Sequence, residues 1–145
     1  MTVKIFYEDV SLGDELPGWD RTTDFMHWNR FAAVNDEFMP FHMDDDEGRK
    51  AGNPGGAFGM GNLRFAYMLN ALQDWIGDEA EVREISCRYR AMNQKGDLLT
   101  VRGKVLEKYL ADGEARIRVE VDVMNQQGES TCPGLALVVL PRRDG

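Results

Sequence analysis

Cysteine and long apolar runs are scarce in this chain, and each scarcity excludes a class of protein. Cys87 and Cys132 are the only cysteines, too few for a disulfide framework and without the spacing of a metal-ligand cluster. We interpret both as small buried hydrophobes. No apolar run approaches the roughly 20 residues that a membrane helix needs, and the opening residues lack an apolar signal core. We therefore expect a soluble cytoplasmic protein.

Positive charge is also in short supply. The chain has 17 Lys and Arg against 25 Asp and Glu, which gives a formal net charge of -8. Such a chain repels nucleic acids and anionic membrane surfaces, so neither is an expected partner. It does not exclude an anionic ligand, because local basic residues decide that. The acidic run at residues 44–47 is interpreted as a solvated helix start and not as a metal site, because no supporting ligand cluster accompanies it.

The chain has 145 residues, enough for one domain that buries its own core. Hydrophobic residues make up 43% and charged residues 29%, as in ordinary globular proteins. No repeat, low-complexity stretch or linker interrupts it. Residues 1–145 are therefore predicted to form a single domain.

Helical spacing of apolar residues first appears after Thr23, which is a plausible N-cap. Phe25, Trp28 and Ala32 recur at intervals that place them on one helix face. This pattern predicts a helix that ends near residues 34–35.

Pro40 prevents that helix from continuing, and residues 44–50 are expected to form a short second helix. In residues 58–76 apolar side chains surround the whole helical cylinder, which is typical of a buried helix. Gly77 and Asp78 are expected to end it.

The second half of the chain has the alternating pattern of strands. Ile117, Val119, Val121 and Val123 alternate strictly with polar residues, and residues 111–114 have the composition of a tight hairpin turn. Three or four antiparallel strands are expected, in the regions 85–89, 99–109, 117–123 and 134–140. A strongly apolar helix needs a sheet to cover it, so we predict an α+β domain with the helix lying in a curved antiparallel sheet.

Residues 37–44 read Glu-Phe-Met-Pro-Phe-His-Met-Asp and resemble the D-x-N-P-x-H-x-D signature of the MaoC-like hydratases. Glu37 stands where the family has its catalytic Asp, five residues before the catalytic His. Met39 replaces the family's Asn, and Asp36 lies where the family usually has Gly. Three residues match outright: Pro40, His42 and Asp44.

Three further segments resemble the same family. Residues 7–14 are similar to its opening segment, residues 57–60 (Ala-Phe-Gly-Met) to its A-H-G-M run before the central helix, and residues 89–97 to its strand-and-turn segment ending in G-D. The resemblance thus covers almost the whole chain. It implies a hot-dog fold that hydrates or dehydrates enoyl or 3-hydroxyacyl thioesters of coenzyme A or acyl carrier protein, in fatty acid or steroid metabolism.

The chemistry implied by the resemblance needs a base for water, a proton for the alpha carbon and a donor to the thioester oxygen. His42 suits the base, because an unperturbed imidazole titrates near neutral pH. Glu37 or Asp36 would be the carboxylate partner, and the sequence leaves that choice open. Gly59, expected at the start of the buried helix where N–H groups are free, would donate to the developing enolate oxygen.

Two other functions on the same fold remain open. One is an acyl-CoA thioesterase, because a fold does not fix a function. The other is a non-catalytic subunit that completes the site of a partner hot-dog chain.

The resemblance implies no metal or redox cofactor. It implies a homodimer or larger assembly, or a hetero-oligomer with a second hot-dog chain.

Overall fold

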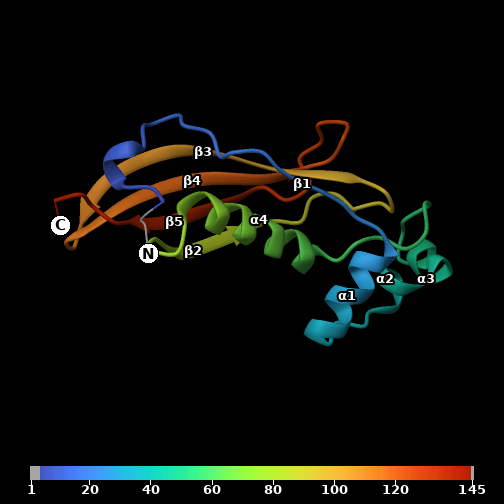
Figure 1. The fold of residues 1–145 in the computed structure, drawn as a ribbon. Coiled ribbons are helices and arrows are strands. Elements are labelled where there is room, and N and C mark those ends of the chain that lie inside the picture. Colours follow the sequence, from blue (N-terminus) through green and yellow to red (C-terminus); the bar gives the residue numbers. More distant parts are fainter. Residues whose placement is uncertain (1–3, 145) are drawn as a thin grey trace.

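A curved antiparallel sheet wraps around one long helix in the computed structural model, which describes residues 4–144 (Figure 1). The sheet has five strands in the order β1-β3-β4-β5-β2. The predicted α+β architecture, with the helix lying in a curved sheet, is therefore confirmed. The strands are β1 (Trp19–Thr22), β2 (Glu81–Cys87), β3 (Leu98–Ala111), β4 (Glu114–Met124) and β5 (Gly134–Leu140).

The centre of the sheet follows directly from the alternating pattern. Strands β3 and β4 form a hairpin whose turn residues, Asp112 and Gly113, both have positive φ, of 52° and 78°. Tight turns of this handedness match the twist of the paired strands. A register shift between Val105 and Glu107 of β3 marks a bulge, which locally bends and twists the strand. Strand β1 was not predicted, because four residues are too few to show a period.

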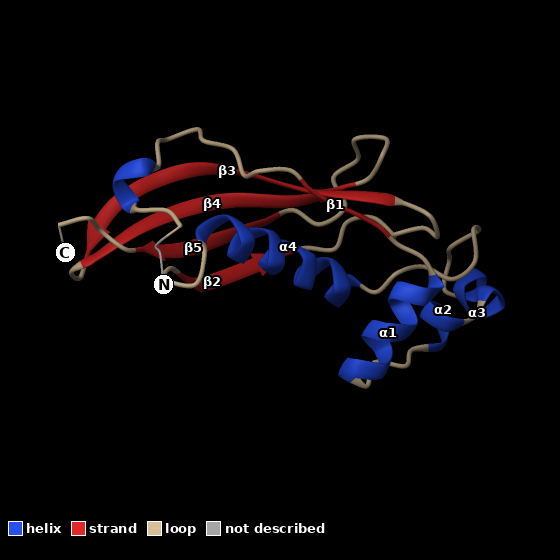
Figure 2. Ribbon diagram, in the orientation of Figure 1, coloured by secondary structure: helices blue, strands red, loops and turns tan. Residues whose placement is uncertain are grey.

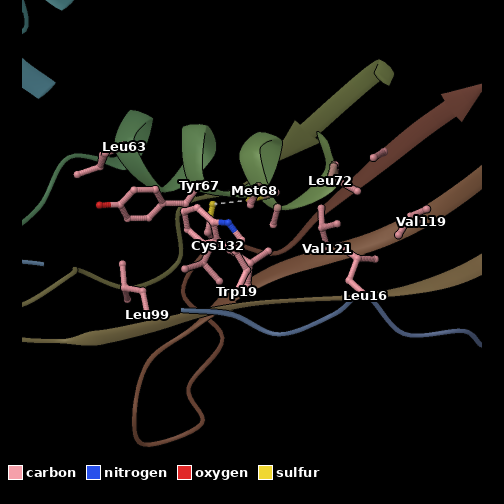
Figure 3. Close-up of a cluster of buried hydrophobic side chains, with 14 of the residues drawn as sticks. Leu16, Trp19, Leu63, Tyr67, Met68, Leu72, Leu99, Val119, Val121 and Cys132 are labelled. Carbon is pink, nitrogen blue, oxygen red and sulfur yellow. Dashed lines mark hydrogen bonds between the residues drawn. The ribbon is translucent and has the colours of Figure 1, made fainter. Parts of the chain in front are cut away.

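Helix α4 (Gly61–Ile76) packs along the face toward which the sheet curls. Figure 3 shows Met68 and Leu72 of this helix on the side of Val119 and Val121 of the sheet, whereas the Tyr67 ring points away from these two valines. All five side chains are buried. The predicted buried helix is therefore confirmed, and Gly77, with a φ of 78°, caps its end as expected.

The start of α4 differs from the expected one. Residues 58–60 are not helical, and Gly59 pairs with Asn93 in an isolated antiparallel bridge. The helix begins at Gly61 after the extended N-cap Met60. The apolar run at residues 58–76 did not reveal this boundary, because an extended buried segment and a buried helix are both apolar.

Three shorter helices gather beyond the N-terminal end of α4 (Figure 2). They are α1 (Phe25–Asn35), α2 (Pro40–Met43) and α3 (Asp45–Lys50), and a short 3-10 helix, η1 (Tyr7–Asp9), precedes β1. Of the three residues predicted to share one face of α1, Trp28 and Ala32 are fully buried and Phe25 is half-buried. The predicted N-cap was wrong by one residue. Asp24 caps α1 by accepting from the N–H of Met26, and the buried Thr23 hydroxyl instead donates to Asn93.

Polar contacts fix these helices to the loop before β3. The side chains of Asn53 and Gln94 exchange two hydrogen bonds, each 2.9 Å long. Asp45 accepts from the backbone N–H of Ala57 at 3.0 Å and from Lys95 at 2.6 Å. The hydrogen bond from Lys95 is the main reason that the pKa of Asp45 is lowered. The short helices therefore have a defined position relative to the sheet and the start of α4.

Both cysteines are free thiols. Cys132 is fully buried and its sulfur lies 3.6 Å from that of Met68, the contact drawn as a dashed line in Figure 3. Cys87 is half-buried. The predicted burial is therefore confirmed for Cys132 and holds only in part for Cys87. Among residues 4–144, no helix is long and apolar enough to cross a membrane.

Candidate active site

His42 lies on the single turn of α2, which begins at Pro40. Proline suits the first position of a helix, because its missing N–H would have no partner there. The imidazole is 6% exposed, and its Nδ1 lies 2.6 Å from the carbonyl oxygen of Phe58. Since a carbonyl can only accept, Nδ1 carries the proton of the neutral ring. The other nitrogen, Nε2, is then the proton acceptor.

The surroundings of His42 are largely aromatic. The rings of Phe41 and Phe58 lie edge-to-face with the imidazole, at centroid distances of 4.5 and 5.2 Å. Burial lowers the pKa of His42, and the Arg64 guanidinium acts in the same direction. The hydrogen bond to Phe58 and the charge of Glu37 oppose them, but the balance is a lowered pKa. His42 is therefore neutral near pH 7, the state in which an imidazole acts as a base.

Glu37 is part of a short polar chain that ends at Tyr89, which lines the same hollow as His42. Its Oε2 accepts from the amide nitrogen of Asn62 at 3.1 Å, and the amide oxygen of Asn62 accepts from the Tyr89 hydroxyl at 3.1 Å. Burial is the largest reason that the pKa of Tyr89 is raised to about 12. The phenol is therefore a stable donor at neutral pH. Glu37 comes close enough to raise the pKa of His42 through its charge.

Asp36 is placed differently. It is the C-cap of α1, with a left-handed φ of 54°, and its backbone N–H donates to the carbonyl of Ala32. The residue is exposed, and no hydrogen bond of the described chain joins its carboxylate to His42 or Asn62. Of the two carboxylates that the sequence left open, only Glu37 affects the pKa of His42 through its charge.

The expectation that the N–H of Gly59 is free was wrong. This N–H donates to the carbonyl of Asn93 at 2.7 Å. Gly59 lies before the helix and not in its first turn. A side chain here would also collide, because an added Cβ would lie 2.3 Å from Oδ1 of Asn93 and 2.7 Å from Nε1 of Trp28. Close packing therefore explains why position 59 is occupied by glycine.

A hollow of about 300 Å³ opens beside His42 at the start of α4. Arg64, Tyr89 and Arg90 line it, and the sequence assigned none of them a role. Arg64 gave no usable signal, because a single arginine in an apolar helix pattern is indistinguishable from a surface residue. The full lining is His42, Phe58, Gly59, Gly61, Arg64, Tyr89, Arg90, Ala91 and Met92.

No family model and no curated protein matches this chain, but several solved structures share its fold. The unliganded (R)-hydratase PhaJ1 of Pseudomonas aeruginosa is 24% identical with a TM-score of 0.84, and the match covers 97% of this chain and 88% of that one. A MaoC-like dehydratase of Rhodospirillum rubrum is 23% identical with a TM-score of 0.82, over 96% and 98% of the two chains.

A third likeness is to a complex of two proteins. A chain of the ChsH1–ChsH2 complex of Mycobacterium tuberculosis is 22% identical with a TM-score of 0.78, over 90% of this chain and 98% of that one. At these identities the likeness establishes the architecture. The chain has the hot-dog fold of the (R)-hydratases and MaoC-like dehydratases.

Proposed function

We propose that this chain adds water to an enoyl thioester of coenzyme A or acyl carrier protein, and catalyses the reverse dehydration. The observation that carries the proposal is His42. It is a buried, neutral imidazole whose Nδ1 is held by the Phe58 carbonyl, so that Nε2 is left as a base, and the charge of Glu37 acts on the ring. The hot-dog architecture shared with (R)-hydratases supports it.

The proposed reaction uses His42 for proton transfer. A water molecule gives a proton to Nε2 while its oxygen forms a bond to the beta carbon of the enoyl group. The electrons of the double bond move through the alpha carbon to the thioester oxygen, giving an enolate. The enolate collapses when the alpha carbon takes a proton, either directly from the imidazolium or from the Glu37 carboxyl group after the imidazolium has passed its proton to that carboxylate. We assign to Glu37, whose charge acts on His42, the orientation of the water and this relay of the proton.

The thioester oxygen needs a donor other than the N–H of Gly59. Gly61 is the first residue of α4 and lines the hollow. The first N–H groups of a helix have no partner within it, and no side chain caps this end of α4. We assign the stabilisation of the enolate oxygen to the Gly61 N–H, supported by the positive end of the helix dipole.

We also propose that the protein works as a homodimer or with a second hot-dog chain. Strand β2 forms one edge of the sheet and pairs only with β5 among the described strands. An unpaired edge is a ready surface for pairing with another chain. The ChsH1–ChsH2 structure is a complex of two different proteins, which makes a hetero-oligomer a second form to test.

The purified chain should be incubated with crotonyl-CoA while two signals are followed. A hydratase removes the absorbance of the conjugated thioester and releases no thiol. A thioesterase releases free coenzyme A. Neither signal, together with co-purification of a second hot-dog chain from the native source, would favour a subunit that completes a partner's site.

A further inference from the structure

Arg64 is a buried cation without a counter-ion. The residue is 3% exposed on α4, and its Nη1 donates to the carbonyl oxygens of Ala91 at 2.6 Å and Thr131 at 3.2 Å. Its Nε is buried without a partner, and Nη2 has no hydrogen bond within residues 4–144. The face of the Tyr89 ring, 5.5 Å from the guanidinium carbon, offers only a weak attraction.

Other arginines of the chain behave differently. Arg83, Arg116 and Arg118 form ion pairs with carboxylates at the surface. No described carboxylate lies within ion-pair distance of Arg64, and burial lowers its pKa. A buried charge is costly unless it is paired, so an arginine in this position is expected to have an anionic partner. The two carbonyl contacts use only one of its three nitrogens.

The location of Arg64 indicates where that partner enters. Arg64 lines the same hollow as His42, and its charge is close enough to lower the pKa of the imidazole. Arg90 lines the hollow as well, whereas no carboxylate does. In a chain with a net charge of -8, this hollow is thus a local basic site next to the proposed base.

We propose that Arg64 binds a carboxylate carried by the acyl group, so that the substrate is the thioester of an unsaturated dicarboxylic acid. The inference rests on the proposed hydration and names its substrate class. A carboxylate fits better than the thioester carbonyl, because it brings a full negative charge and two oxygens for a guanidinium fork. It also fits better than a coenzyme A phosphate, because the exposed Arg88 and Arg90 can bind a bulky hydrated phosphate whereas Arg64 is enclosed.

The test compares two five-carbon enoyl thioesters that differ at one end. Glutaconyl-CoA ends in a carboxylate, and 2-pentenoyl-CoA ends in a methyl group. The wild-type chain should prefer glutaconyl-CoA by about tenfold or more in kcat/KM, the range of a hydrogen-bonded charge pair. Arg64→Met keeps the length of the side chain without its charge. It should remove the preference, because turnover of glutaconyl-CoA should fall far more than turnover of 2-pentenoyl-CoA.

Arg90→Met is the matched control, because it removes a charge from the same hollow but from an exposed side chain. It should keep the preference for glutaconyl-CoA. A wild-type preference for 2-pentenoyl-CoA, or equal losses on both substrates in Arg64→Met, would overturn the proposal. The latter result would assign Arg64 to the thioester oxygen. If Arg64→Met does not fold, Arg64→Lys is the second variant. It should weaken the preference for glutaconyl-CoA without abolishing it, and an unchanged preference would count against the carboxylate site.

A binding measurement separates this inference from the proposed reaction. If neither enoyl thioester is hydrated, the hydratase function has failed, and calorimetry with the saturated pair glutaryl-CoA and valeryl-CoA still tests Arg64. Tighter binding of glutaryl-CoA in wild type, lost in Arg64→Met, would support the carboxylate site. Equal binding of both compounds would rule it out.

Discussion

At the scale of single residues, His42 combines a fixed orientation with a neutral ring. Replacing it with Asn keeps a donor that can reach the Phe58 carbonyl but removes the base. We expect His42→Asn to fold and to lose about 100-fold or more in turnover, the range for a lost general base. Steady-state kinetics on a confirmed substrate, with circular dichroism as the folding control, checks this. Turnover near the wild-type value would remove His42 from the mechanism.

The lowered pKa of His42 gives a dependence on pH with a defined sign. At a pH below 6.5, the ordinary pKa of His42, the unfolded chain binds a proton at this residue more readily than the folded chain does. The stability associated with the neutral buried ring is therefore complete above pH 6.5 and declines as the pH falls toward the lowered value. The stability advantage of wild type over His42→Asn in urea should shrink between about pH 7.5 and about pH 5.5. An advantage that is constant with pH would show that the pKa is not lowered.

The carboxylates are separated by matched amide substitutions. Glu37→Gln keeps the size and one acceptor oxygen but cannot take a proton as a carboxylate does. We expect it to reduce turnover far more than Asp36→Asn. Of the two residues, only Glu37 accepts a hydrogen bond from Asn62 and affects the pKa of His42 through its charge. Glu37→Gln should also move the pH optimum of kcat, because the substitution removes a charge that raises the pKa of His42. Damage from Asp36→Asn with a silent Glu37→Gln would reverse the assignment.

At the scale of elements, the segment before α4 is held by close packing. Gly59→Ala would place a methyl group against Asn93 and Trp28, whereas an added Cβ at Gly18 meets nothing within 4 Å. We expect Gly59→Ala to destabilise the fold by about 1–3 kcal/mol, as overpacking does, and Gly18→Ala to be near neutral. Urea unfolding of the two variants tests this. Equal stabilities would show that the contact with Asn93 is not as tight as described.

The elements also show what a single sequence can predict. Strict alternation in residues 117–123 and the turn at residues 111–114 predicted β4 and its hairpin, because both signals are local. The boundary of α4 depends on the Gly59–Asn93 bridge between distant segments, so it has no local signal. Arg64 could not be recognised for the same reason, because its two carbonyl partners lie 27 and 67 residues away. His42 and Glu37 were proposed from the resemblance of residues 37–44 to the MaoC-like signature.

At the scale of the whole molecule, the exposed edge strand is the feature that predicts assembly. Pairing of β2 with a second copy would extend the sheet across two chains. We expect light scattering at micromolar concentration to give about twice the chain mass of 16.4 kDa. A monomer would argue against a homodimer and favour a search for a different hot-dog partner.

The most direct test of the proposed reaction is to follow the oxygen of water. Crotonyl-CoA should be incubated with the chain in water enriched in heavy oxygen, and the products weighed by mass spectrometry. We predict 3-hydroxybutyryl-CoA with the heavy oxygen in its acyl chain and the thioester intact, and no such product from His42→Asn. Free coenzyme A, with the heavy oxygen in the carboxyl group of the released acid, would contradict hydration and identify a thioesterase.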